Sequence, residues 1–281
     1  MKRVYKLRVE LLDGKVYETI PDTLLAFGNL DSVYHSFRTV SEVNGSKEYF
    51  VDIHFDAHSE SSGSYYFIWK FKGTFKVITS AELDKNEEPC GDIDCIGCSI
   101  CNRVQKCSGI RNFGTPRDPI FRRIGPCQCC TCWYNIFNES PILSDYQILQ
   151  SGKFTGVRAG VIRVDDWVLQ HKIYADVDQF SLTRQAYTFY KAIKDQQEGS
   201  TSLFQPASGK ITGNFIQQDG AKEPILGLFY ATSIQTKTIV ITKRDVPKDT
   251  YEFPHEDARA PSNCLKLYPN STTEKPPFWV D

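Results

Sequence analysis

One helical pattern between strand-like segments constrains the fold of this chain more than any other feature. It lies within residues 176–241, where apolar side chains recur at the helical period. These side chains are Leu182, Ala186, Phe189, Tyr190 and Ile193. The stripe predicts one amphipathic helix over residues 181–198, packed on a sheet, although its aromatic residues could instead face a ligand. Ser181 is the expected N-cap residue, and Gly199 suits the left-handed position after the last turn.

Strand-like segments lie on both sides of this helix. Residues 210–216 alternate between apolar and polar side chains, and Gly213 within them indicates a bulge or the close approach of another backbone. Residues 224–231 are apolar enough to form a buried strand, and residues 235–241 alternate again. These patterns predict a helix on a mostly antiparallel sheet.

The first half of the chain has strand patterns as well. In residues 49–56, Val51, Ile53 and Phe55 fall on one face and polar side chains on the other, which suits a sheet with one face in water. Further strands are predicted at residues 31–40, 65–78, 156–164 and 168–178. The predicted fold class is mainly β: a β-sandwich-like (immunoglobulin/fibronectin-like) domain with one packed amphipathic helix and a cysteine-rich insertion.

Three parts are expected along the 281 residues. They are residues 1–20, 21–246 and 247–281. The first part is a hairpin with its turn at Asp13-Gly14. The second is the main β domain, which contains the cysteine-rich insertion at residues 81–132. The third is a polar, proline-rich tail, and we expect its apolar end at residues 276–279 to dock on the domain.

Cysteines are concentrated in the insertion. The ten residues are Cys90, Cys95, Cys98, Cys101, Cys107, Cys127, Cys129, Cys130, Cys132 and Cys264. An exported protein with this density forms disulfides, whereas a cytosolic one usually binds metal. We favour disulfides for an exported chain, because the CxCCxC cluster is a poor zinc knuckle. A zinc or iron–sulfur site and partly free thiols are the alternatives. Cys264 is expected to pair with one of the nine upstream cysteines and to hold the tail across the domain.

Charge and hydropathy argue against two classes of partner. The formal net charge of −1 provides no overall field toward nucleic acid. No run of 18 apolar residues is present that could form a transmembrane helix. The insertion is locally basic, which suits recognition of phosphate or acidic sugar, although a solvated loop explains the same charges. Its basic residues are Arg103, Lys106, Arg111, Arg117, Arg122 and Arg123.

One polar strand end carries the candidate chemistry. Asp52, His54, Asp56 and His58 could hold a metal, and the first three are what a hydrolase acting on glycan or peptide would use. The alternative is a polar strand end that leads into a serine-rich loop. The sequence has no glycine-rich phosphate loop and no HExxH motif, and Asp165-Asp166 has the pattern of a turn. We therefore predict no catalytic residue, no metal site and no cofactor.

Several stretches resemble the Bacteroidota outer-membrane lipoproteins grouped as domain of unknown function 4249. The similarity runs through most of the chain and is strongest after residue 176. The matching residues are 179–191 (QFSLTRQAYTFYK), 202–207 (SLFQPA), 211–214 (ITGN), 226–231 (LGLFYA), Tyr65-Tyr66 with Trp69, Cys132-Trp133, and Cys264 with 277–279 (PFW).

The resemblance implies a compartment and a kind of partner. Members are exported and lipid-anchored, and they are often encoded beside TonB-dependent outer-membrane transporters. The family begins with an export signal, a lipidated cysteine and an immunoglobulin-like domain, so residues 1–20 are expected to be the remnant hairpin of that domain. We expect a non-catalytic cell-surface lipoprotein that binds a glycan or peptide, or assists such a transporter. A secreted hydrolase and a metal-binding module built on the cysteine cluster are the alternatives.

Overall fold

The fold is described from a computed structural model. The residues that it describes are 3–26, 28–42, 45–59, 66–81, 107–114, 118, 120–138, 140–144, 149–150, 153–199, 211–218, 225–248, 250–255 and 258–281.

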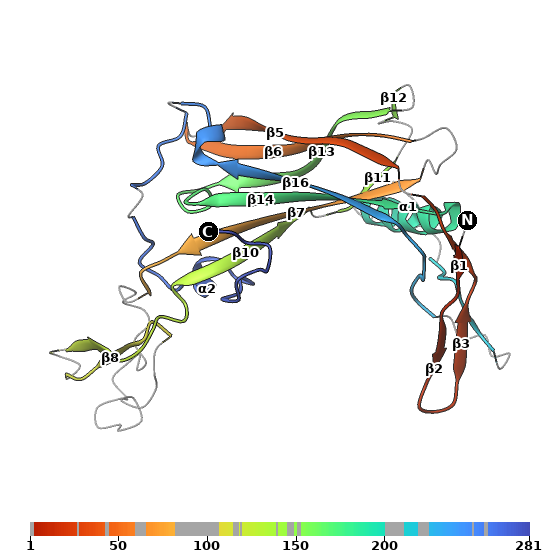
Figure 1. Cartoon of the computed structure of the whole chain (residues 1–281), viewed down its shortest axis with the longest axis horizontal. Helices are drawn as coiled ribbons and strands as arrows, with labels where there is room; N and C mark the ends of the chain where they lie inside the picture. Colours follow the sequence, from red (N-terminus) through yellow and green to blue (C-terminus); the bar gives the residue numbers. More distant parts are fainter. Residues whose placement is uncertain are drawn as a thin grey trace.

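Two antiparallel sheets form the body of the protein (Figure 1). The strands of the first sheet, in spatial order, are β12 (Leu149–Gln150), β13 (Lys153–Val164), β6 (Lys47–His58) and β5 (Asn29–Ser41). Those of the second are β10 (Thr131–Phe137), β7 (Phe67–Ile78), β14 (Lys172–Ser181) and β16 (Ile234–Thr242), with β11 (Ile142–Leu143) also paired with β7. The mainly-β, sandwich-like fold class is confirmed.

The core lies between these two sheets, and strand alternation fills it. Val51, Ile53 and Phe55 of β6 are buried, as the sequence pattern predicts. From the other sheet, Trp69 of β7 packs against Phe55 with ring centroids 4.8 Å apart. Gly160 of β13 makes room for Phe71 of β7, since a Cβ at Gly160 would lie 2.2 Å from a ring carbon of Phe71. Because side chains alternate with a period of two along a strand, the positions of the apolar residues decide which face of each long strand is buried.

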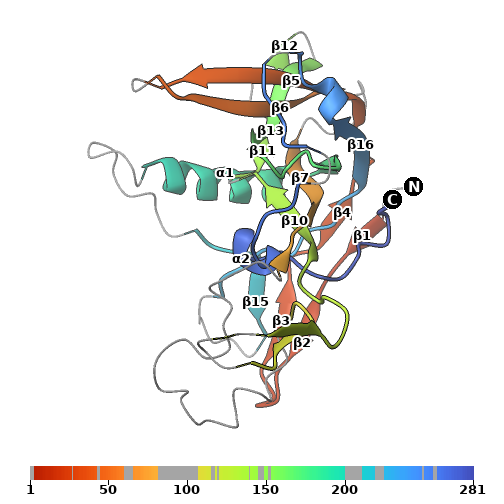
Figure 2. The same ribbon diagram turned by 90° about the vertical axis from the view of Figure 1, so that its left-hand side faces the viewer.

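The predicted helix is α1 (Arg184–Gly199), and it extends outward from the body (Figure 2). Leu182 and Ala186 pack with Ile68 of β7 and Leu143 of β11 in a second apolar cluster. The predicted N-cap residue is wrong: Ser181 is the buried last residue of β14. The side chain that accepts a hydrogen bond from the first turn is that of Thr183, which receives the Ala186 amide at 3.4 Å. Both residue types suit a cap, so the sequence alone did not separate them.

The N-terminal segment forms an arm that projects from the large sheets (Figures 1 and 2). Its strands are β1 (Arg3–Tyr5), β2 (Arg8–Glu10), β3 (Val16–Thr19) and β4 (Asp22–Leu24). β2 and β3 form the predicted antiparallel hairpin, with Gly14 in its turn at a φ of 83°. β3 also pairs with β15 (Phe215–Gln217), and β1 pairs with β4. The arm is thus tied to a segment that follows α1.

The buried strand predicted at residues 224–231 is wrong for the part that the structure describes. Residues 225–233 run without a strand partner in the described chain, and Leu226 is largely exposed. Side chains rather than a ladder hold this segment: Asn214 and Asp22 accept the amides of Phe229 and Ala231. An apolar run indicates burial or packing, but not which groups satisfy its backbone.

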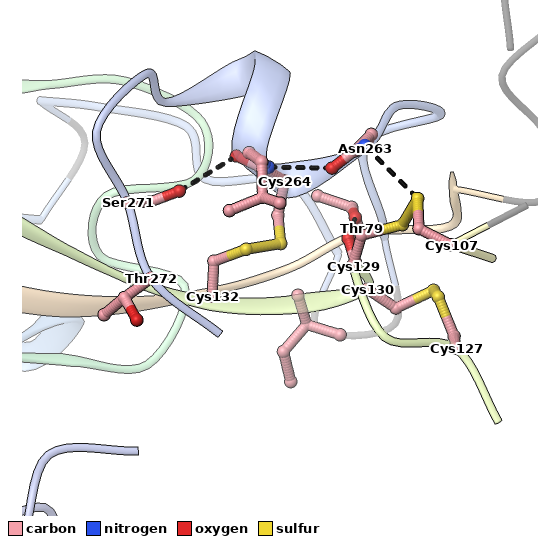
Figure 3. The surroundings of a disulfide bond; sticks show 12 residues. Thr79, Cys107, Cys127, Cys129, Cys130, Cys132, Asn263, Cys264, Ser271 and Thr272 are labelled. Carbon is pink, nitrogen blue, oxygen red and sulfur yellow. Dashed lines mark hydrogen bonds between the residues drawn. A yellow bond between two sulfur atoms is a disulfide. The ribbon is translucent and has the colours of Figure 1, made fainter. Parts of the chain in front are cut away.

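Among the described residues, three disulfides link cysteines within the insertion and join the insertion to the tail (Figure 3). The pairs are Cys107–Cys129, Cys127–Cys130 and Cys132–Cys264. Cys264 begins the short helix α2 (Cys264–Leu267), whose N-cap Asn263 accepts the Leu265 amide and donates to the sulfur of Cys107. Two short strands, β8 (Ile110–Asn112) and β9 (Phe121–Arg123), pair beyond this cluster.

The end of the tail docks on the second sheet. After β16 the chain passes through the 3₁₀ helix η3 (Lys243–Asp245) and returns over β10 and β14. Trp279 is buried, with its ring centroid 5.1 Å from that of Tyr174 and 6.4 Å from that of Trp133. Asp281, two residues later, pairs with Lys76 of β7 at 2.8 Å. The apolar end of the tail therefore contacts the domain, as its composition predicts.

Candidate functional site

A groove of about 760 Å³ runs along one face of α1. The helix contributes Arg184, Gln185, Thr188, Phe189, Ala192 and Asp195. The opposite wall is formed by residues 211–213 and by Leu228. A concave surface of this size, with mixed apolar and polar lining, is where a protein of unknown function most often binds a ligand.

The helical wall follows from the spacing of its residues. Phe189 and Ala192 are half-buried at the floor, while Gln185 and Thr188 are exposed. Residues three and four apart share a helix face, so these side chains line one continuous strip. The opposite face of α1 carries Ala186, which is buried against the sheet. The apolar stripe that predicts the helix is thus divided: most of it packs on the body, and Phe189 faces the groove.

The second wall depends on a close approach between two glycines. A Cβ on Gly213 would lie 1.7 Å from the carbonyl oxygen of Gly227, so only glycine fits there. The neighbouring Asn214 is buried and binds the backbone of Phe229 twice. Its amide nitrogen donates to the Phe229 carbonyl at 2.7 Å, and its oxygen accepts the Phe229 amide at 2.9 Å. The prediction of a close backbone approach at Gly213 is confirmed.

Two tyrosines and an aspartate fix this wall to the helix and the arm. Tyr190 of α1 donates to the hydroxyl of Tyr230 at 3.1 Å, and their rings meet edge to face. Burial and this hydrogen bond raise the pKa of Tyr190 well above its ordinary value, so the hydroxyl stays protonated. Asp22 of β4, itself buried, accepts the Ala231 amide at 2.9 Å. Hydrogen bonds to α1 and β4 therefore hold this wall in place, although the wall has no strand pairing of its own.

The lining provides several kinds of contact at once. Phe189 offers an aromatic surface, and Gln185 and Thr188 offer hydrogen-bond donors and acceptors. Arg184 and Asp195 carry opposite charges, and their positions on the helix place them about 17 Å apart. The groove suits an elongated ligand that has both apolar and hydrogen-bonding groups.

The predicted site residues alternate with the buried residues of β6, so they lie on the outer face of the first sheet, and none of them lines the groove; they are Asp52, His54, Asp56 and His58. Asp52 pairs with Arg38 of β5 at 2.7 Å. Asp56 accepts hydrogen bonds from Ser32, Tyr34 and the Gly156 amide. Burial opposes ionisation of Asp56, but these hydrogen bonds outweigh it and lower its pKa below the ordinary value.

His54 and His58 also have partners on this face. His54 lies 3.1 Å from the Ser36 hydroxyl and stacks on Tyr34. His58, at the end of β6, lies 2.8 Å from Asp31. Among the described residues, no three histidine, cysteine or acidic side chains converge as metal ligands. Asp165 and Asp166 lie at the predicted turn, where Asp165 accepts the amides of Trp167 and Val168.

The insertion falls partly outside the described residues. Cys90, Cys95, Cys98 and Cys101 lie there, as do Arg103, Lys106 and Arg117. Arg122 and Arg123 are exposed on β9, and Arg122 lies over the ring of Phe113. Of the residues in the predicted basic patch, the structure therefore describes two side chains, and both lie on the same short hairpin.

The groove itself was missed at the level of sequence. The signals were Gly213-Asn214 and Gly227, which reflect one close contact between distant segments. Read alone, Gly213 indicates a bulge or the close approach of another backbone, but not which segment approaches it. The groove forms only because residues 211–213 and 228 lie beside α1 in space. No local sequence pattern predicts that contact.

A comparison with protein families gives a match over most of the chain. A family model described as domain of unknown function (DUF4249) matches residues 1–238. No curated protein and no solved structure matches the chain. In the described part of the chain, none of the helices has the length and hydropathy required to cross a bilayer.

Proposed function

The chain belongs to the family described as domain of unknown function DUF4249, and we propose that it is a non-catalytic binding protein. The groove between α1 and the segment at residues 211–213 holds its ligand, which is an elongated glycan or peptide. The observation that carries this proposal is the groove itself. It has a volume of about 760 Å³ and a wall held in place by Asn214 and Asp22.

The construction of the groove favours binding over covalent chemistry. Its lining contains one aromatic ring, neutral polar side chains and two charged residues of opposite sign. Among the described lining residues, the groups that could act as a base or nucleophile are Asp195, Thr188 and Thr212, and there is no histidine, cysteine or serine. Rigid walls reduce the conformational entropy lost when a ligand binds.

Export to the outer membrane and cell surface, with attachment through a lipid anchor, completes the proposal. Two observations support it. The family resemblance implies such a location, and the six cysteines that the structure describes are paired in three disulfides, which persist in oxidising compartments. The protein would then present its ligand to, or assist, a TonB-dependent outer-membrane transporter.

A groove-blocking variant tests ligand binding. Thr188→Trp places a bulky ring in the groove, whereas Lys194→Trp adds the same ring on a part of α1 that does not line it. Calorimetric titration with a panel of short oligosaccharides and short peptides should find a ligand for wild type. Binding should be lost in Thr188→Trp and kept in Lys194→Trp. A ligand that binds all three proteins equally would place the site elsewhere and overturn the proposal.

A second experiment addresses the partner. The protein is purified from native membranes under mild detergent, together with whatever remains bound to it. Recovery of a TonB-dependent transporter in a fixed ratio is expected. If no outer-membrane transporter is recovered under conditions that keep other membrane complexes intact, the accessory role is wrong, while the ligand-binding result stands separately.

A further inference from the structure

The two charged side chains of the groove lie near its two ends. Arg184 begins α1 and is exposed, and among the described residues no carboxylate pairs with its guanidinium. Asp195 lies about 17 Å further along the helix and pairs with Lys191 at 3.9 Å. Both side chains of this pair are about half exposed, so water and a competing cation exchange with it easily. The groove therefore offers a cation at one end and an anion at the other.

Helix stability does not explain the positions of these two charges. The first turn of a helix carries partial positive charge and the last turn partial negative charge, so Arg184 and Asp195 both oppose the helix dipole. α1 has no acidic residue in its first turn and no basic residue in its last. Local rules of this kind are most often broken at functional sites. For a ligand, the dipole and the side chains agree: both favour an anion beside Arg184 and a cation beside Asp195.

The opposite wall has backbone groups that are open to a ligand. Residues 211–213 line the groove without belonging to a strand. In the part of the chain that the structure describes, their amides and carbonyls form no hydrogen bond within the protein. An extended peptide pairs with such groups as an added strand does, because its residues carry a donor and an acceptor at a regular spacing. The hydroxyl groups of a glycan do not follow this spacing, so the wall favours a peptide.

The middle of the groove is apolar. Phe189 follows Arg184 by five residues, which places it about halfway between the two charges. Ile211 and Leu228 are half-buried on the opposite wall. An apolar side chain at the centre of a bound peptide is therefore removed from water between these three residues.

We infer that the groove binds a short, extended peptide by both of its ends, an inference that rests on the ligand-binding function proposed above. The carboxylate of the peptide pairs with Arg184, its ammonium group pairs with Asp195, and its central side chain packs on Phe189. An extended chain advances about 3.3 Å per residue, so about five residues span the distance between the two charges. Peptide and groove are then complementary in charge, length and backbone hydrogen bonding.

Peptides with modified ends test the inference on the full chain. The probe is a pool of random-sequence pentapeptides, prepared with both ends free, with an acetylated N-terminus, with an amidated C-terminus, and with both modifications. Mass spectrometry measures how much of each pool the immobilised protein retains. Wild type should retain the free pool at least about tenfold more than the doubly modified pool, because each modified end loses a charge-assisted hydrogen bond. Tripeptides should be retained less, since they cannot reach both charges.

Two variants assign each end of the peptide to a residue. Arg184→Gln should lower retention of the free pool about tenfold, and amidation should then have no further effect. Asp195→Asn should lower it to a similar extent, and acetylation should then have no further effect. Both side chains are exposed, so thermal unfolding should stay unchanged. Arg244→Gln is the control, because it removes an exposed charge outside the groove and should retain every pool as wild type does.

The outcomes separate this inference from the proposed function. If peptides bind wild type but not Thr188→Trp, and free and modified pools are retained equally, the inference is overturned while the groove remains a binding site. A groove that retains oligosaccharides and none of the peptide pools also overturns it. Peptides retained equally by wild type and Thr188→Trp overturn the proposed function, and the inference with it.

Discussion

Cys264 forms a disulfide with Cys132, which lies 132 positions earlier in the chain. The bond joins helix α2 to strand β10, and the Cys264 amide also donates to the Cys129 carbonyl at 3.1 Å. Closing so long a loop removes much of the entropy of the unfolded chain, by about 5 kcal/mol in the loop-entropy model. We expect the double variant Cys132→Ala/Cys264→Ala to lose about 3–5 kcal/mol of unfolding free energy in urea denaturation.

A second disulfide provides the matched control. Cys127 and Cys130 are three positions apart, and closing so short a loop is worth about 1–2 kcal/mol in the same model. Cys127→Ala/Cys130→Ala should therefore destabilise much less. If the two double variants lose equal amounts of unfolding free energy, the Cys132–Cys264 bond does not stabilise the protein by restricting the unfolded chain.

The sequence predicts which face of a strand is buried, because this depends only on residues that are close together in the sequence. Alternation in β6 identifies Val51, Ile53 and Phe55 as core, since strand geometry alone sends them to one side. The partner of Cys264 could not be predicted, because ten cysteines allow many pairings that local spacing does not rank. The groove was missed for a similar reason. It depends on Gly213 meeting Gly227, which a tertiary contact decides.

Tyr268 should make stability depend on alkaline pH. Its hydroxyl donates to both oxygens of Asp165, at 2.8 and 2.6 Å. Burial, and then this hydrogen bond to a carboxylate, raise the pKa of Tyr268 far above its ordinary value. The unfolded chain loses this proton near pH 10 and the folded protein does not, so the stabilising contribution is complete below pH 10 and falls as pH rises above it.

The variant Tyr268→Phe separates this contribution from other alkaline effects. It should cost about 1–3 kcal/mol at pH 8, because Asp165 loses a hydrogen bond. Between pH 10 and 11 the difference in unfolding free energy between wild type and the variant should become smaller. Urea denaturation at each pH measures it. A constant difference across this range would mean that Tyr268 is not the group responsible.

Gly213 should tolerate no side chain. In Gly213→Ala the new Cβ meets backbone atoms of Gly227, which cannot rotate away, so the groove wall must separate. We expect a loss of about 2–3 kcal/mol in unfolding free energy together with loss of ligand binding. Gly14→Ala is the control: its φ is 83°, but nothing lies within 4 Å of a Cβ there, so only backbone strain of about 1 kcal/mol is expected. Similar losses at the two positions would contradict the close contact.

Trp279 should anchor the end of the tail. It is 3% exposed between Tyr174 and Trp133, whereas Phe278 beside it is 42% exposed. The backbone of Thr272 exchanges two hydrogen bonds with that of Trp133, at 2.8 and 2.9 Å. Protection of these two amides from hydrogen exchange therefore shows whether this part of the tail is attached.

The tail can detach after Cys264 without unfolding the body, because the disulfide to Cys132 holds the chain at that point. Trp279→Ala removes about 3 kcal/mol of packing, which corresponds to roughly a hundredfold more frequent local opening. Hydrogen exchange at the amides of Thr272 and Trp133 should speed up by that factor, while exchange in β6 stays unchanged. Phe278→Ala should change exchange at both amides far less. If both variants accelerate exchange equally, burial of Trp279 is not what holds the tail; if exchange in β6 rises as well, the tail is part of the global folding unit.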